Sequence, residues 1–374
     1  MRRRLSSTLF ASLLLFLFAV PTQLWGWGNT GHEAVAYVAW QQMTPAAQAR
    51  AIQLLKLVPT LHSPTGKSVP GYSDWVTDLP SGLSQDDQHL YLFMRAATWP
   101  DSIKHVGFKD SDVPPAGMTT DVNIGFSDTA SHGYWHFIDT GFASDHSTVP
   151  ATPVPNAATQ IVALRTAIGS GESDDLEAYD MVWLEHLVGD IHQPLHGTTR
   201  YFGGKGDEGG NLVKIKLPLA MEKEFEGTLS KSAPRELHAF WDDLPGEGDP
   251  APALPNAASF AKPLASAPAD KVADTDPSDW ATESFTIAKT DAYCKPIGKG
   301  LQPTASTGSK SKSKSSTKPK PVALSETPAK SSKPATSSSY LITQAYYDQA
   351  MKDAQDRVAL AGARLAKVLN DNLK

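Results

Sequence analysis

The stretch from Leu176 to His192 constrains the fold of this chain more than any other part of the sequence. Its residues are apolar on nearly every side, so the pattern predicts a helix that is buried on all faces. The same helix carries His186 and Asp190 four positions apart, which places both side chains on one face. A carboxylate is costly in an apolar interior unless it is paired or bound to a cation. The fold must therefore provide a partner for Asp190.

Two other parts of the sequence offer the same residue types. His196 follows Pro194, which ends the helix and turns the chain, and His238 and Asp242 repeat the four-residue spacing. Imidazole nitrogens and carboxylate oxygens are the ligands that zinc takes in proteins. A single His-x-x-x-Asp pair is usually a core histidine beside a surface carboxylate. The combination of two pairs and a third histidine favours a metal site.

The remaining sequence predicts mostly helices. A helix over residues 33–51 should restart at Thr44, because a threonine followed by proline is typical of a helix N-terminus. Further helices are predicted at Ala158–Ile168, Ser284–Tyr293 and Ile342–Leu369. Alternating patterns typical of strands are sparse, and Asn211–Leu217 is the best short candidate. The sequence therefore predicts an all-α fold.

Two segments interrupt the helical pattern. Residues 249–279 are rich in Pro, Ala and Asp, and we expect a long irregular excursion between helices there. Residues 299–339 consist almost entirely of Lys, Ser, Thr and Pro, with eight lysines and one glutamate. Such a composition buries too little apolar surface to order itself. We predict a solvated, disordered insertion at 299–339, and the alternative is a basic tether for nucleic acid or an envelope polymer.

The N-terminus has the pattern of a secretory signal peptide. Arg2, Arg3 and Arg4 precede an apolar run at Leu13–Val20, which is too short to cross a membrane. We predict that residues 1–26 are a leader and that residues 27–374 form one mature domain, secreted or periplasmic and not inserted in a membrane. Cys294 is the only cysteine, so the core or bound metal must stabilise the fold.

The charge balance limits how the protein could hold nucleic acid. The formal net charge is −6, whereas binding through many phosphate contacts needs a dense Lys/Arg surface. Any chemistry on nucleic acid would therefore have to rest on a local site.

A series of short motifs resembles the S1/P1 nuclease family. The run from His186 to His196 reads H-x-x-G-D-x-H-Q-P-L-H, and residues 238–242 read H-x-x-W-D. The other matches are Trp27 with His32, W-P-D at 99–101, H-F-I-D at 136–139, G-G-N at 209–211 and the helix at 361–370. They occur in family order from residue 27 to 370. The resemblance implies a single helical domain of the phospholipase C/P1 nuclease type, here with two loop insertions.

The resemblance also implies nine ligands around three zinc ions. The first ion would be held by Asp101, His136, His186 and Asp190, and the third by His196, His238 and Asp242. The second would be held by His32, by Asp190 as a bridge, and by the α-amino nitrogen and carbonyl of Trp27. That amino group is available only after cleavage behind Gly26. Of the histidines that match no ligand, His192 should orient a neighbour. We expect the others on the surface, namely His62, His89, His105, His132 and His146.

The activity implied by the resemblance is that of a zinc-dependent endonuclease. It would hydrolyse single-stranded DNA or RNA to 5′-phosphate products as a monomer, and would also act on 3′-nucleotides. Asp101 would orient the attacking water and Lys104 would face the phosphate. Phe137 would stack on a base, Asp139 would accept hydrogen bonds from its edge, and Asn211 would assist.

Two alternatives remain open at this point. A zinc phospholipase C shares the fold and the metals, although those enzymes have Glu where Asp242 stands and place the first histidine further from the N-terminal Trp. A non-catalytic secreted zinc-binding protein is the other alternative.

Overall fold

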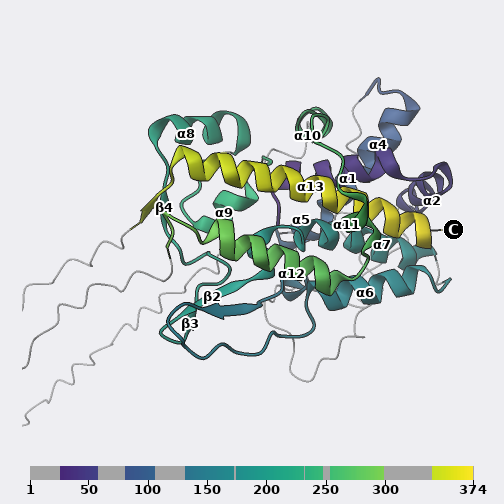
Figure 1. Ribbon diagram of the computed structural model, residues 1–374. Coiled ribbons are helices and arrows are strands. Elements are labelled where there is room, and N and C mark those ends of the chain that lie inside the picture. Colours follow the sequence, from purple (N-terminus) through teal and green to yellow (C-terminus); the bar gives the residue numbers. More distant parts are fainter. Residues whose placement is uncertain are drawn as a thin grey trace, which may run out of the picture.

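The computed structural model describes residues 26–57, 81–105, 131–171, 174–230, 232–246, 253–298 and 339–373. It is mostly helical, which confirms the predicted all-α fold (Figure 1). The predicted leader lies outside the described residues except for Gly26, and so does the predicted insertion except for residue 339. Within the described ranges, no helix has the combined length and apolarity that crossing a bilayer requires.

Helices near the N-terminus form one side of the core. Helix α1 (Asn29–Gln42) ends before a restart at α2 (Pro45–Leu55), as the sequence predicts. The Thr44 hydroxyl accepts a hydrogen bond from Ala47 N at 3.2 Å and so caps α2. Next come α4 (Gln85–Ala96), the single turn α5 (Trp99–Ser102) and the 3₁₀ turn η1 (Ile103–His105).

The central helix is α7 (Asp174–Asp190), which confirms the predicted buried helix but ends two residues earlier. Every residue from Glu177 to Asp190 is buried. Helix α6 (Ala157–Ile168), also predicted, packs against α7. Because α7 is enclosed on all sides, any polar side chain that it carries must find its partners inside the protein.

The C-terminal helices pack against α1, α6 and α7. Helix α12 (Pro277–Ile287) continues into the π-helical turn η5 (Ala288–Ala292), and α13 (Gln344–Asn372) follows, so both helices predicted here are confirmed. In Figure 1 the long yellow helix α13 crosses the picture lengthwise, next to the green α12. Helix α13 also packs closely on α1, because a Cβ at Gly362 would lie only 2.5 Å from Val38 Cβ.

Short elements connect these helices. They are η2 (Gly133–Trp135), β1 (Gly141–Ala143), η3 (Pro194–Gly197), β2 (Thr199–Phe202), β3 (Lys205–Gly206), β4 (Ile215–Lys216), α8 (Leu219–Glu224), η4 (Phe225–Leu229), α9 (Leu237–Asp242) and β5 (Tyr340–Leu341). Strand β2 pairs in parallel with β1 and antiparallel with β3, and β4 pairs in parallel with β5. Of the predicted strand Asn211–Leu217, two residues form β4, and Lys214 before them makes an isolated antiparallel bridge with Glu236.

The predicted excursion at 249–279 is wrong for its described part. Residues 253–279 contain α10 (Ala253–Ala261), α11 (Ala269–Ala273) and the start of α12. Two of the prolines lie at helix starts, Pro268 as the N-cap of α11 and Pro277 in the first turn of α12. Proline is tolerated at these positions, and the many alanines favour helix. This composition therefore forms short helices whose starts are marked by proline, and not one irregular loop.

Candidate metal centre

Histidine and aspartate side chains from separate elements converge beside the end of α7. Helix α7 supplies His186 and Asp190, and α1, α5, η2, η3 and α9 supply or directly precede the others. They form three groups, and the potential ligand atoms within each group lie within 4.8 Å of one another. The groups are His32, His186 and Asp190; Asp101, His136 and His186; and His196, His238 and Asp242. These contain all eight side chains that the sequence predicts as ligands.

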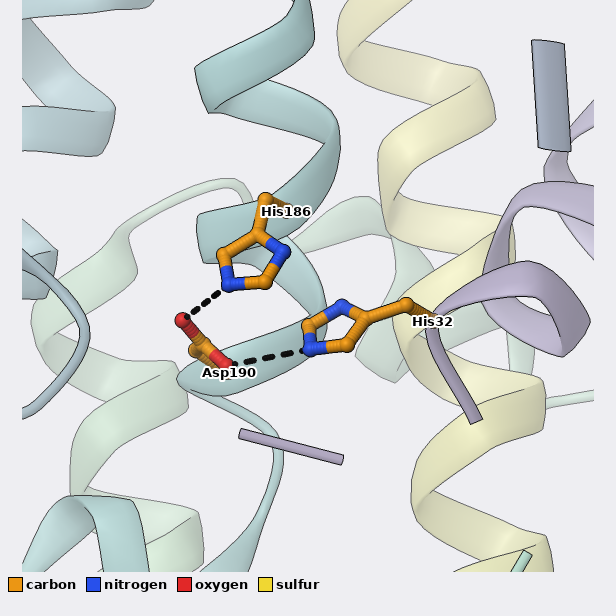
Figure 2. Close-up of side chains that lie close together, drawn as sticks. All are labelled: His32, His186 and Asp190. Carbon is orange, nitrogen blue, oxygen red and sulfur yellow. Dashed lines mark ion pairs between the residues drawn. The ribbon is translucent and has the colours of Figure 1, made fainter. Parts of the chain in front are cut away.

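Asp190 faces two of the groups with its two carboxylate oxygens. Oδ1 lies 3.4 Å from His32 Nε2, whereas Oδ2 lies 3.1 Å from His186 Nε2 (Figure 2). Oδ2 is also 2.9 Å from His136 Nδ1. The side chain is fully buried. Asp190 is therefore placed where a carboxylate could bridge two cations.

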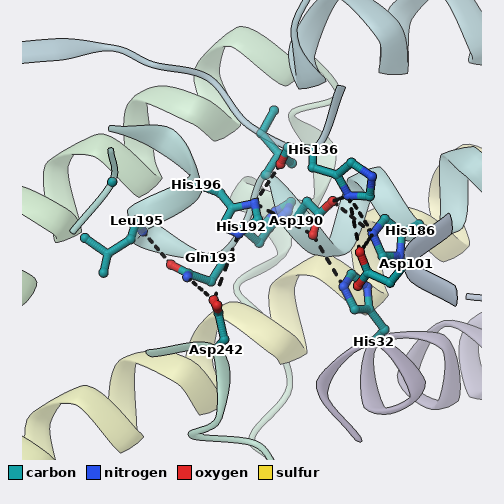
Figure 3. Close-up of polar contacts among 12 residues, drawn as sticks. His32, Asp101, His136, His186, Asp190, His192, Gln193, Leu195, His196 and Asp242 are labelled. Atoms are coloured by element: carbon teal, nitrogen blue, oxygen red, sulfur yellow. Dashed lines mark hydrogen bonds and ion pairs between the residues drawn. The ribbon is translucent and has the colours of Figure 1, made fainter. Parts of the chain in front are cut away.

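Asp101 completes the group around His136 and His186. Its Oδ1 lies 3.8 Å from His136 Nδ1 and 3.7 Å from His186 Nε2 (Figure 3). Lys104 donates to the same oxygen at 2.7 Å, and both side chains are only 4% exposed. The predicted nucleophile-orienting residue is thus fixed by the predicted phosphate-facing lysine.

The spacing of these atoms suits a metal ion. Ligands about 2.0–2.1 Å from a tetrahedral zinc lie about 3.4 Å from one another, and the distances around Asp190, from 2.9 to 3.4 Å, are equal to that value or slightly shorter. His32 Nε2 and Asp190 Oδ1 are buried and make no hydrogen bond to any described residue. His186 Nδ1 must donate to Ala97 O at 2.7 Å, because a carbonyl only accepts. A neutral His186 therefore presents its Nε2 lone pair to the group.

In the third group, as at His186, each histidine ring is oriented by a hydrogen bond from its Nδ1 to a backbone carbonyl. His196 Nδ1 donates to His136 O at 2.6 Å, and His238 Nδ1 donates to Gly209 O at 2.8 Å. In the neutral rings, both Nε2 lone pairs then face each other across 3.2 Å, which is unfavourable unless a cation lies between them. Asp242 Oδ2 lies 3.5 Å from His238 Nε2. These donors fit a bound metal.

Charge and burial keep several of these side chains in the form that binds metal. Burial lowers the pKa of His32, and burial together with the Lys104 ammonium lowers the pKa of His136 to about 3. Burial raises the pKa of Asp101, but Lys104 and His186 outweigh it and hold that pKa low. His186 is an exception: burial would lower its pKa, but Asp190 and Asp101 raise it, so this ring holds a proton more readily and must release it to bind metal. Neutral imidazoles and ionised carboxylates are the metal-binding forms.

Gln193 supports the third group, although it is not among the residues predicted from the sequence. The side chain is fully buried; its Oε1 accepts from Leu195 N, and its Nε2 donates to Asp242 Oδ1 (Figure 3). This amide leaves Asp242 Oδ2 directed at His238. The position of Gln193 inside the H-Q-P-L-H run was the available signal, because a buried amide between two ligands needs hydrogen-bond partners there.

Gly209 matters through its backbone. Its φ of +59° lies in the left-handed region, and a Cβ would lie 2.8 Å from Leu195 O and 3.1 Å from His238 Nδ1. Only glycine can bring this carbonyl to His238 without strain. The G-G-N motif thus shapes the third group.

Of the residues predicted to contact substrate, one packs against the core and two are held by hydrogen bonds within the protein. Phe137 is partly buried and packs against the core. Asp139 Oδ1 accepts a hydrogen bond from Thr199 at 2.6 Å, and burial raises the pKa of this carboxyl. The Asn211 side chain donates to Glu208 O at 2.8 Å, so it is engaged within its own loop.

The other histidines separate into buried and exposed positions. His192 is buried and bonds to Val188 O and to Arg364, and His146 is exposed. The expectation that His132 lies on the surface is wrong: it is 1% exposed and stacks on Trp135 at 4.0 Å. His89 is partly buried, while His62 and the side chain of His105 lie outside the described residues.

The chain segment at Trp27 passes directly beside the Asp190 groups. Trp27 is fully buried, and Gly28 N donates to Asp242 O at 2.9 Å. A Cβ at Gly26 would lie 1.7 Å from Asp190 Oδ1 and 2.7 Å from His32 Nε2. The backbone at Gly26 thus lies against two of the predicted ligands.

Comparison with known proteins agrees with this geometry. Residues 27–374 match the family model described as S1/P1 nuclease. A search of curated proteins found no match. The family match spans nearly the whole chain and contains all three His/Asp groups. The chain therefore belongs to the S1/P1 nuclease family, which implies a hydrolase that acts on phosphodiester bonds.

Proposed function

We propose that this protein is a secreted or periplasmic zinc-dependent endonuclease. It cuts single-stranded DNA or RNA, leaves 5′-phosphates, and also removes phosphate from 3′-nucleotides as a monomer. Family membership supports the nuclease activity. The observation that carries the proposal is the set of three buried His/Asp groups. Two of them share His186, and Asp190 of the first lies 2.9 Å from His136 of the second.

Zinc is the metal that the donor atoms favour. Magnesium and calcium prefer all-oxygen ligands, whereas these groups contain five imidazoles and three carboxylates. Three groups would accommodate three ions, and Asp190, which lies close to His32 of one group and His136 of the next, would bridge two of them. Zinc bound there would lower the pKa of water toward neutrality and so supply the nucleophile at neutral pH.

Asp101 and Lys104 have the geometry for orientation and charge neutralisation. The Lys104 ammonium fixes Asp101 Oδ1 at 2.7 Å, so this carboxylate is held in place to accept a hydrogen bond from the attacking water. The same ammonium offers a positive charge to a phosphate oxygen. As a compact point charge, lysine does this without the two-pronged geometry that arginine would impose.

Recognition of the base would fall to Phe137 and Asp139. Thr199 orients the Asp139 carboxyl, whose second oxygen would accept N–H groups from a base edge. Stacking on an aromatic ring is worth about 1–3 kcal/mol per base and requires an unpaired base. This requirement accounts for a preference for single strands.

Removal of the leader would complete the second group. Cleavage after Gly26 gives Trp27 a free α-amino group beside His32 and Asp190, where the Gly26 backbone otherwise lies. An amine ligates metal only when it is free and deprotonated. The uncut chain should therefore lack activity.

The deciding experiment uses mature protein that begins at Trp27, loaded with zinc. Hydrolysis of a single-stranded oligonucleotide and of its duplex is followed with and without a chelator, and the product ends are identified. We expect chelator-sensitive cleavage of the single strand, recovery on adding zinc, and 5′-phosphate ends. The Asp190→Asn variant should be inactive and serves as the matched control.

Absence of cleavage by fully zinc-loaded, correctly processed protein would contradict the proposal. Hydrolysis of phosphatidylcholine under the same conditions would instead support the phospholipase alternative. Metal binding without turnover of either substrate would indicate a binding protein.

A further inference from the structure

The C-terminal end of α7 is closed by side chains from other helices. The last carbonyls of a helix lack partners within the helix and need donors from elsewhere. Here Ile191 O accepts from Ser284 Oγ of α12 at 2.6 Å, and His192 O accepts from Arg357 Nε of α13 at 3.0 Å. Arg357 also donates to Ser284 Oγ at 2.9 Å, so the two donors support each other.

A second arginine of α13 holds the ring of His192. Arg364 Nη1 donates to His192 Nε2 at 3.0 Å, and His192 Nδ1 donates to Val188 O at 2.8 Å. The imidazole is thereby bonded at both nitrogens. Arg364 is fully buried, and its guanidinium carbon lies 5.1 Å from the centre of the Trp280 ring.

Glu283 of α12 joins the two arginines. Its Oε2 accepts from Arg357 at 2.9 Å and from Arg364 at 2.7 Å. Its Oε1 accepts from Arg364 at 3.1 Å and from Lys271 at 2.9 Å. We call Glu283, Ser284, Arg357 and Arg364 the arginine clamp. Three of its hydrogen bonds reach the turn that follows α7, at Ile191 and His192.

The clamped residues lie between two predicted metal ligands. Asp190 precedes Ile191 directly, and His196 follows four residues after His192. Asp190 Oδ1 and His196 Nδ1 are 3.8 Å apart, so a small rotation of this turn would change both the Asp190 groups and the third group. Positive charge at the C-terminal end of a helix is also favourable, because it opposes the helix dipole.

We propose that Arg357 and Arg364 are positioning residues for the metal centre, acting through the turn at residues 191–192. The proposal rests on the proposed function only in requiring that the His/Asp groups bind metal. The clamp fixes the turn after α7, so that Asp190 and His196 stay in position. A bound ion would then leave more slowly. Residues of this kind, which hold the ligands in place, typically change metal affinity by about 10–100-fold when they are mutated.

The test measures the rate at which zinc-loaded protein loses metal to a chromogenic chelator. The variants are Arg357→Met, Arg357→Lys, Arg364→Met and Ser284→Ala. The matched control is Arg165→Met, because Arg165 also donates to a carbonyl, Thr275 O at 2.7 Å, but makes no hydrogen bond to residues 191–192 among the described residues. Each protein is assayed at the same interval below its own Tm, so that global stability does not dominate the rates.

We expect Arg357→Met and Arg364→Met to release metal at least about tenfold faster than wild type. Arg357→Lys should rescue part of this loss because it keeps the charge, and Ser284→Ala should have a smaller effect in the same direction. Arg165→Met should stay within about twofold of wild type. Ser284→Ala removes only one hydroxyl, so it provides a result even if Arg357→Met does not fold.

Equal release rates for the clamp variants, Ser284→Ala included, and the Arg165 control would overturn the proposal. Nuclease activity is not measured in this experiment. A protein that binds zinc but cleaves no nucleic acid would refute the proposed function, whereas the release rates would still decide the role of the clamp.

Discussion

The Asp190 groups and the third group reach similar donor sets by different means. Around Asp190, the donors come from the helices α1, α5 and α7 and from His136 after η2. His186 belongs to both groups, and the Asp190 carboxylate lies close to donors of both. In the third group, His238 depends on the carbonyl of Gly209, and Asp242 depends on the Gln193 amide. One region is built mainly on helices, but its two groups depend on the same His186 and Asp190 side chains. The other has its own ligands but relies on loops to aim them.

Asp190→Asn should have the largest effect, because it removes a ligand from both groups at once. We expect the purified variant to hold one zinc ion instead of three and to lose more than about 100-fold in kcat. Metal content by mass spectrometry under native conditions checks this expectation. Retention of three ions would mean that Asp190 is not a bridge.

Asp242→Asn should remove only the third ion. The two ions beside Asp190 should remain, and kcat should fall by a smaller factor than in Asp190→Asn. The same native mass measurement, made on both variants in parallel, gives the contrast. Loss of all ions from Asp242→Asn would show that the groups are cooperative rather than separate.

Gly209→Ala should weaken the third group without removing any ligand. A left-handed φ costs alanine about 1–2 kcal/mol, and its Cβ would approach Leu195 O to 2.8 Å. The carbonyl that orients His238 must then shift, so zinc affinity at this group should fall by about tenfold. Gly203→Ala is the control, since it also has a positive φ but a Cβ there meets no atom within 4 Å. Similar zinc affinities in the two variants would argue against the loop's role.

The smallest effect should come from Asp353→Asn on α13. Asp353 belongs to neither region, so this variant shows how a change in stability alone, with no loss of metal, affects Tm. Burial and, next, Asp291 raise the pKa of Asp353 to about 6. The folded state therefore binds more protons than the unfolded state between about pH 4 and pH 6, and its stability falls as pH rises through this window. Asp353→Asn should raise Tm at pH 8 but not at pH 4, with the exposed Asp348→Asn as control. A Tm rise equal at both pH values would exclude this cause.

The sequence predicts the metal-ligand side chains better than the residues that orient them. His186 and Asp190 could be predicted because a polar pair in an apolar helix requires a partner or a cation inside the protein, and the family motifs supplied the rest. Gln193, Arg357 and Arg364 act across distances of 49 to 172 residues, which periodicity does not detect. The burial of His132 was missed because a lone histidine in a short turn carries no periodic signal, and its partner Trp135 also faces the core. The helices within 253–279 were missed because prolines at helix starts resemble loop composition.

The close approach of Gly26 to Asp190 has a consequence for the cell that makes the protein. While any residue precedes Trp27, a peptide bond stands in place of the free amine. If that amine binds metal and the protein is exported, as proposed, the organism's own RNA should be safe from the uncut chain. The same logic applies to an affinity tag: one placed ahead of Trp27 should abolish activity, whereas one placed after Lys374 should be harmless. Full activity from protein with an intact N-terminal tag would show that the amine is dispensable.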